Sequence, residues 1–326
     1  MVSVPLLLAA LALVLAWPVP VVLSRSRWPV RSPFTAMVLW QAIALAGGLS
    51  MIGALLVYGL APLGGNLLQS TTELWHVLTE NRSAESLGLL HVFALSTAGL
   101  LGTHLVFTLL LTYVRIQHQR RRHRSRLDLL SFPSKETPGT VVISHPVPVA
   151  YCLPGGGKSV TVLSDGLLDM LSADELNAVM AHERAHLAQR HHLLLWTFAA
   201  WRSALPWLPT SQLAFASVNA LVEMLADDAA LLRIERASLI RAIAIVASGQ
   251  APPSGVGSGD VLKPLTASVL DRDPDSVPEL ESTADRLRRL LTPQQPLPAV
   301  ARYGSLAGSV GLTLMPAVLL LVPGLW

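Results

Sequence analysis

The amino-acid sequence predicts an α-helical membrane protein in which four transmembrane helices carry an inserted α+β domain. Hydrophobic residues make up 52% of the chain and charged residues only 14%, whereas a soluble domain carries about 25% charged residues. The apolar residues form four long runs, and most of the polar residues lie between the third run and the fourth. The single cysteine excludes an internal disulfide framework and a multi-cysteine metal site, so a metal would need His, Asp and Glu as ligands.

Four apolar segments reach or approach the roughly 20 residues that cross about 30 Å of hydrocarbon as a helix. They run over residues 4–23, 34–60, 87–114 and 305–322. No Lys or Arg precedes the first segment and three arginines follow it, which favours an uncleaved anchor over a cleaved signal peptide. We therefore expect three transmembrane helices within residues 1–114, one inserted domain at residues 115–304, and a fourth helix with a short external tail at residues 305–326.

The distribution of arginine predicts the orientation in the membrane. The loop at residues 24–33 holds three arginines, whereas the loop at residues 61–86 holds only Arg82, together with three glutamates. An arginine-rich run at residues 115–126 directly follows the third segment, which favours a topology determinant over a nucleic-acid site. We expect a multi-pass protein of a bacterial inner membrane with a cytoplasmic inserted domain, a lipid bilayer around its helices and no direct binding of nucleic acid. The sequence gives no indication of the oligomeric state.

The inserted domain begins with short β segments and continues with a polar helix. Residues 140–144 and 159–163 read as strands. Ser172 and Glu175 match the capping-box pattern S-x-x-E at the start of a helix, which we expect to run to about His192. This helix carries too many charged residues to cross a lipid core comfortably.

An HExxH motif lies in this helix, at residues 182–186. His182 and His186 are one turn apart on one face, so both can reach a single tetrahedral ion. Glu183 is placed beside the metal, where it can accept a proton from zinc-bound water and deliver it to a leaving amine. The pattern predicts one Zn²⁺ ion and a zinc-dependent metalloendopeptidase with Glu183 as its catalytic base.

Two residues compete for the third ligand position. His192 stands where the longer metzincin pattern places its last histidine, but that pattern needs a glycine where this chain has Gln189. Glu223 and Asp227 lie four residues apart on one face of a second predicted helix, so Glu223 can bind zinc while Asp227 accepts the outer N–H of a ligand histidine. We predict Glu223 as the ligand.

The order of these motifs resembles that of membrane gluzincins, above all the BlaR/MecR-type metallopeptidases, and more distantly the HtpX-type peptidases. The resemblance covers about residues 140–230. It rests on Gly-Leu-Leu at 166–168, Asp-Glu-Leu at 174–176, the HExxH motif and Glu-x-x-Ala-Asp at 223–227. It implies a gluzincin-type fold for the inserted domain, with His182, His186 and Glu223 as ligands and Glu183 as the general base.

Two further expectations come from this resemblance. The first is an edge strand that pairs with the backbone of an extended substrate. Its residues would be Ser159, Val160, Thr161, Val162 and Leu163. The second concerns Arg286, in a segment similar to a helix that follows the active site in the wider clan. Related peptidases often begin that element with His-Pro, which is absent here, so Arg286 is a candidate either for stabilising the transition state or, preferably, for a structural salt bridge.

Residues 191–209 are apolar and rich in tryptophan, which is typical of the membrane interface. A further span there would separate His186 from Glu223 across the membrane. We therefore expect a hairpin that lies on the membrane.

Antibiotic-sensing relatives carry a penicillin-binding sensor after the fourth span, with its nucleophile in S-x-x-K. This sequence ends there, and no lysine has a serine three residues earlier, so we expect no sensor domain and no covalent β-lactam sensing. The resemblance implies a signalling or antirepressor protease that cleaves a cytosolic or membrane-proximal protein, such as a transcriptional repressor. A quality-control protease for membrane proteins and a non-catalytic signalling scaffold are the alternatives.

Overall fold

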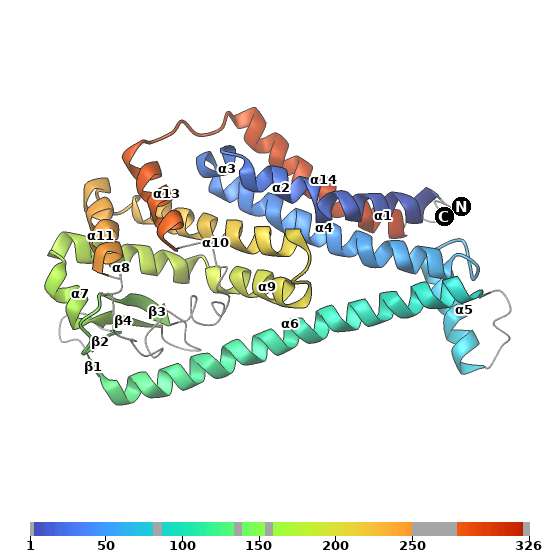
Figure 1. The fold of residues 1–326 in the computed structure, drawn as a ribbon, viewed down its shortest axis with the longest axis horizontal. Coiled ribbons are helices and arrows are strands. Elements are labelled where there is room, and N and C mark those ends of the chain that lie inside the picture. Colours follow the sequence, from blue (N-terminus) through green and yellow to red (C-terminus); the bar gives the residue numbers. More distant parts are fainter. Residues whose placement is uncertain (1–2, 81–86, 134–138, 154–158, 250–278, 322–326) are drawn as a thin grey trace. The chain divides into compact units, whose positions relative to one another are not determined.

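The structure is a computed structural model that describes residues 3–80, 87–133, 139–153, 159–249 and 279–321. Within these ranges the chain is mostly helical and holds one small mixed sheet (Figure 1). The chain divides into two compact units. The first comprises Met1–Leu110, Ala200–Val218 and Pro296–Trp326, and the second comprises Leu111–Ala199 and Asn219–Gln295.

Within the described residues, the first unit consists of helices and the loops that connect them, without strands. Its elements are α1 (Ser3–Ala16), α2 (Pro18–Arg25), α3 (Trp28–Arg31), α4 (Pro33–Leu60), α5 (Leu67–Thr79), the beginning of α6 (Leu89–Leu130), the end of α9 (His191–Ala204), the beginning of α10 (Pro209–Ala230) and α14 (Ala299–Leu321). Four stretches are long and apolar enough to cross a membrane, namely Val4–Arg25, Pro33–Leu60, Leu89–Leu127 and Ala299–Leu321. The four predicted apolar helices are therefore present, the last beginning at Ala299 rather than at residue 305. Their insertion into a membrane stays a prediction.

The first apolar stretch is built from two helices that meet at Trp17. Pro20 has no N–H to donate to the carbonyl of Ala16, four residues earlier, so this carbonyl needs another donor. The hydroxyl of Thr210, at the start of α10, donates to the carbonyl of Ala16 and, at 2.9 Å, to that of Leu15. The end of α1 is thus tied to a segment nearly 200 residues further along the chain.

The loop predicted at residues 61–86 contains a helix that the sequence reading did not anticipate. Asn66 caps α5, because its side-chain oxygen accepts a hydrogen bond from the backbone N–H of Gln69 at 2.8 Å. This is the usual way in which Asn starts a helix.

The second unit contains a four-stranded sheet. Its strands are β1 (Ser131–Pro133), β2 (Thr140–Ile143), β3 (Ala150–Leu153) and β4 (Val160–Ser164), in the order β1-β2-β4-β3. The pair β2–β4 is parallel, and the other two pairs are antiparallel. The sheet buries an apolar cluster of Leu127, Ile143, Val149, Tyr151, Leu153 and Val162.

The predicted edge strand is not at an edge. The strand formed by Val160, Thr161, Val162 and Leu163 is β4, and it pairs with β2 on one side and with β3 on the other. The prediction was wrong because β4 lies between β2 and β3, so that β3 occupies the hydrogen-bonding edge of β4 that faces away from β2. Among the described strands, β1 and β3 are the two edge strands of the sheet, and β3 is the edge strand next to β4.

Helices complete the second unit. They are α7 (Asp165–Met170), α8 (Ala173–Ala188), the beginning of α9, the end of α10, α11 (Arg236–Gly249) and α13 (Glu279–Leu291). The predicted capping box is present at the start of α8, where Ser172 and Glu175 exchange hydrogen bonds. Buried residues of α8, α10, α11 and α13 form a common core, namely Ala178, Ala230, Leu239, Ala242 and Leu290.

Helix α8 ends earlier than predicted, at Ala188 instead of about His192. Arg190 has a positive φ of 51°, a left-handed conformation that ends a helix. A new helix, α9, begins at His191, and it is joined to α10 by residues 205–208. The expected hairpin over residues 191–209 is therefore helical, and its place at a membrane surface stays a prediction.

Candidate metal centre

Helix α8 carries the HExxH motif, and its first turn is held in place by hydrogen bonds to Glu175. The carboxylate of Glu175 accepts the backbone N–H of Ser172 at 2.9 Å and a hydrogen bond from Arg241 at 3.1 Å. The hydrogen bonds from Ser172 and then from Arg241 hold the pKa of Glu175 below its ordinary value. The start of this helix is therefore stabilised by a charged cap.

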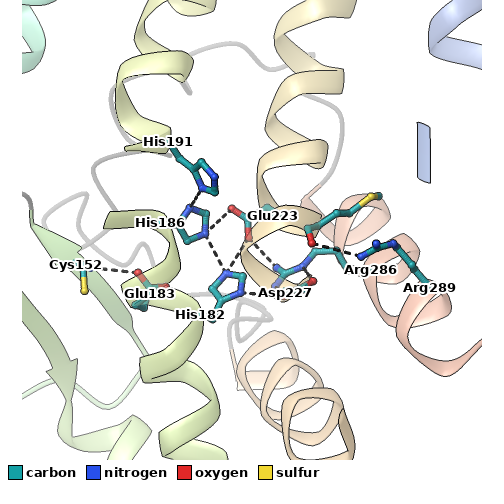
Figure 2. A network of polar contacts seen from close by, with 10 residues as sticks. Cys152, His182, Glu183, His186, His191, Glu223, Asp227, Arg286 and Arg289 are labelled. Atoms are coloured by element: carbon teal, nitrogen blue, oxygen red, sulfur yellow. Dashed lines mark hydrogen bonds and ion pairs between the residues drawn. The ribbon is translucent and has the colours of Figure 1, made fainter. Parts of the chain in front are cut away.

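The side chains of His182, His186 and Glu223 converge (Figure 2). The Nε2 atoms of the two histidines are 3.1 Å apart. The carboxylate of Glu223, which projects from α10, lies 3.3 Å from Nε2 of His182 and 3.4 Å from Nε2 of His186. The structure thus brings together the three residues that the sequence predicts as ligands.

These distances fit a tetrahedral metal site. Ligand atoms at about 2.0–2.2 Å from zinc in a tetrahedron are about 3.3–3.6 Å from one another. Two imidazole nitrogens and a carboxylate oxygen are also ligands that zinc accepts. The group formed by His182, His186 and Glu223 could therefore hold a metal ion.

The outer nitrogen of His182 faces a buried carboxylate. Nδ1 of His182 lies 2.9 Å from Asp227, whose side chain is only 1% exposed. Burial alone would lower the pKa of His182, but the contacts with Asp227 and Glu223 raise it to about 9. Asp227 therefore has the position expected of the residue that orients a ligand histidine.

Arg286, from α13, contacts two of the three acidic residues of α10, Glu223 and Asp227. Its Nε and one terminal nitrogen donate to the two oxygens of Asp227 at 2.9 and 2.7 Å, and the other terminal nitrogen lies 3.0 Å from Glu223. Burial alone would raise the pKa of Glu223, but the charges of His186 and Arg286 hold it well below its ordinary value. Of the two roles considered for Arg286, this geometry favours the structural salt bridge.

A second ion pair joins the same two helices. Arg289 donates to the carboxylate of Asp228 at 2.8 Å. Asp228 thus has a structural contact and lies outside the group of potential metal ligands found among the described residues.

Glu183 lies between the ligand group and the sheet. Its carboxylate accepts the backbone N–H of Cys152, in β3, at 3.2 Å (Figure 2). Burial raises the pKa of Glu183 above its ordinary value, although the two histidines act in the opposite direction. A raised pKa makes a carboxylate a stronger proton acceptor, as a general base requires.

His191 is a site residue that the sequence reading missed. Its Nδ1 lies 3.0 Å from Nδ1 of His186, and burial lowers its pKa to about 4. The prediction assumed an unbroken helix to about His192 and considered only His192 as a ligand, which in such a helix would point away. His192 indeed lies outside the ligand group of the described residues, whereas the turn at Arg190 brings His191 to His186.

A helix that supplies two histidines and a glutamate, with a carboxylate ligand from a second helix, defines a metallopeptidase-type centre. Residues 116–250 match the family model of Peptidase family M48, a family of zinc metallopeptidases. The match covers the sheet, the HExxH helix and Glu223, and it supports a metallopeptidase function for this part of the chain. Comparison with curated proteins and with solved structures gave no match.

Proposed function

We propose that this protein is a membrane-embedded zinc metalloendopeptidase. The observation that carries the proposal is the convergence of His182, His186 and Glu223 at distances of 3.1–3.4 Å, with Glu183 beside them. A site that binds zinc only for structure needs no additional carboxylate next to the ligands. The match to Peptidase family M48 supports the same conclusion.

Each side chain of the site has a separate task in peptide hydrolysis. His182, His186 and Glu223 would hold one zinc ion, which when bound supplies a Lewis acid for water and for the peptide carbonyl. Glu183 takes a proton from the attacking water and transfers it to the nitrogen of the leaving amine. Asp227 keeps His182 oriented, and Arg286 keeps the carboxylates of Glu223 and Asp227 in place.

The substrate backbone is proposed to pair with β3 rather than with β4. In antiparallel pairing, alternate residues direct their N–H groups away from the partner strand. The N–H of Cys152 is directed away from β4, since it donates to Glu183. An extended peptide added to this edge would place its backbone beside the catalytic carboxylate, which is recognition by β-augmentation.

The substrate class follows from the predicted topology. The arginine-rich run at residues 115–126 favours a cytoplasmic catalytic unit at the inner face of a bacterial membrane. A peptidase in this position has access to cytosolic and membrane-proximal proteins. We propose a signalling protease of the BlaR/MecR type whose substrate is a regulator such as a transcriptional repressor.

The matched pair Glu183→Gln and Asp174→Asn tests the enzymatic part of the proposal. Both changes replace an acid by its amide in α8, but Asp174 is exposed in the first turn. Purified in detergent with zinc, the Glu183→Gln protein should cleave casein at least about 100-fold more slowly than the wild type and keep its zinc. The Asp174→Asn protein should cleave normally. Equal rates for the wild type and Glu183→Gln would refute the peptidase proposal.

The substrate class requires a separate experiment. The Glu183→Gln protein, expressed in its native host and isolated with bound proteins, should retain its substrate for identification by mass spectrometry. Specific enrichment of one soluble regulator supports the signalling role. Enrichment of many unrelated membrane proteins would contradict it and favour quality control.

A further inference from the structure

The second ligand histidine has an unusual partner on its outer side. His191 is 3% exposed, and its Nδ1 lies 3.0 Å from Nδ1 of His186. The other ring nitrogen, Nε2, lies 2.8 Å from the side-chain oxygen of Gln189. Figure 2 shows the ring of His186 between those of His191 and His182.

This chain of contacts determines which nitrogens carry protons. The amide oxygen of Gln189 can only accept, so Nε2 of His191 must be the N–H. The two Nδ1 atoms are 3.0 Å apart, so one donates and the other accepts, and a ring with its proton on Nε2 has its lone pair on Nδ1. That lone pair accepts the Nδ1–H of His186, which leaves Nε2 of His186 unprotonated and directed at the ligand group.

We propose that His191 is a positioning residue that fixes His186 in the tautomer and ring orientation required of a zinc ligand. The inference rests on the proposed zinc site. It gives both ligand histidines an outer partner, with Asp227 behind His182 and His191 behind His186. The partner of His182 is a carboxylate, whereas that of His186 is an imidazole.

The backbone explains why His191 can act in this way. The helix ends at Ala188 and the positive φ of Arg190 turns the chain back, so that position 191 lies beside the last turn of α8. His191 is not itself a ligand, because its near nitrogen faces the outer nitrogen of His186 rather than Nε2. It contributes by holding His186.

Zinc affinity of the full-length protein in detergent is the direct test. His191→Phe keeps an aromatic ring but has no acceptor, so zinc should bind about 10- to 100-fold more weakly in competition with a chromogenic chelator. His191→Asn restores an acceptor near the position of Nδ1 and should recover most of this loss. The neighbouring control His192→Phe should bind zinc as tightly as the wild type. Thermal unfolding of the metal-free proteins reports separately on packing.

Gln189 offers a second test at an exposed position where folding is not at risk. Gln189→Glu keeps an acceptor for Nε2 of His191 and should retain zinc affinity. Gln189→Lys offers only a donor, which favours the opposite tautomers, and it should weaken zinc binding. If His191→Phe does not fold, this pair decides the question.

The outcomes separate the two proposals. A wild-type protein that binds no zinc would refute the zinc site itself. If the wild type binds one zinc ion, equal affinity in His191→Phe, equal losses in His191→Phe and His191→Asn, or equal affinity of the two Gln189 variants would overturn the role of His191 alone.

Discussion

At the scale of single residues, Arg286 joins two carboxylates that the site needs for different purposes. Glu223 is a predicted ligand and Asp227 is predicted to orient His182, and both contact the guanidinium group of Arg286. Asp227 is 1% exposed and Arg286 is 13% exposed. A buried ion pair contributes little net stability, but the loss of one partner leaves the other charge buried without compensation.

Replacing Arg286 by leucine should therefore destabilise the second unit strongly. We expect the free energy of unfolding to fall by about 3–5 kcal/mol, because the buried carboxylate of Asp227 loses its bidentate partner. Denaturant unfolding in detergent micelles, followed by circular dichroism, would measure the change. Arg288→Leu is the matched control, since Arg288 is 76% exposed and pairs with Asp285 at the surface; its effect should stay below about 1 kcal/mol. Similar losses in both variants would contradict the structural role of Arg286.

The residues of the site that follow from helical periodicity could be predicted from the sequence. His182 and His186 in one helix, and Glu223 and Asp227 in another, share a spacing of four residues that places each pair on one face. His191 could not be predicted in this way. Its position depends on a left-handed residue at Arg190, and arginine gives no signal for this conformation, as glycine or asparagine would.

At the scale of elements, two of the four strands, β2 and β4, could be recognised, but β1, β3 and the strand order could not. Short runs of β-branched residues predict β2 and β4, whereas β3 has only four residues, none of them β-branched, and gives no such signal. Strand β4 pairs in parallel with β2 on one side and antiparallel with β3 on the other. The edge available to a substrate therefore moves from residues 159–163 to Ala150–Leu153.

The edge can be tested with a substitution that removes one N–H group. Cys152→Pro eliminates the donor that faces Glu183 but no bond to β4, and proline is tolerated where an edge N–H points away from the sheet. If substrate pairs with β3, KM for a peptide substrate should rise about tenfold, which corresponds to one lost hydrogen bond, while zinc content stays unchanged. A fall in kcat without a change in KM would instead reflect the lost hydrogen bond from Cys152 to Glu183.

Cys152→Ala is the control for the side chain. Burial raises the pKa of the Cys152 thiol to about 11, so the thiol is an unreactive group at neutral pH and its removal should leave peptide hydrolysis intact. If the alanine variant lost as much activity as the proline variant, the effect would belong to the side chain and the β3 edge would be excluded.

At the scale of the whole molecule, helix α6 is much longer than a helix needs to be to cross the hydrocarbon layer of a membrane. Its 42 residues make a helix about 63 Å long at 1.5 Å per residue, twice the thickness of the hydrocarbon layer. The sequence predicts the apolar part of this helix and the arginine-rich part that follows. The sequence did not predict that one continuous helix contains both parts, because each part matches a separate pattern.

The sequence also does not predict that residues 200–218 group with the apolar helices. That grouping depends on contacts between residues far apart in the chain, such as the one between Thr210 and Leu15.

The orientation of this helix determines which compartment supplies the substrate, and two fusions to alkaline phosphatase can establish it. Alkaline phosphatase is active only outside the cytoplasm. A fusion after residue 126, beyond the arginine-rich run, should be inactive because short basic segments stay in the cytoplasm. A fusion after residue 79, at the end of α5, should be active because the loop at residues 61–86 carries a single arginine and three glutamates. Green fluorescent protein at the same two positions should give the opposite pattern. Phosphatase activity after residue 126 would place the HExxH helix outside the cytoplasm, and a cytosolic repressor could then no longer be the substrate.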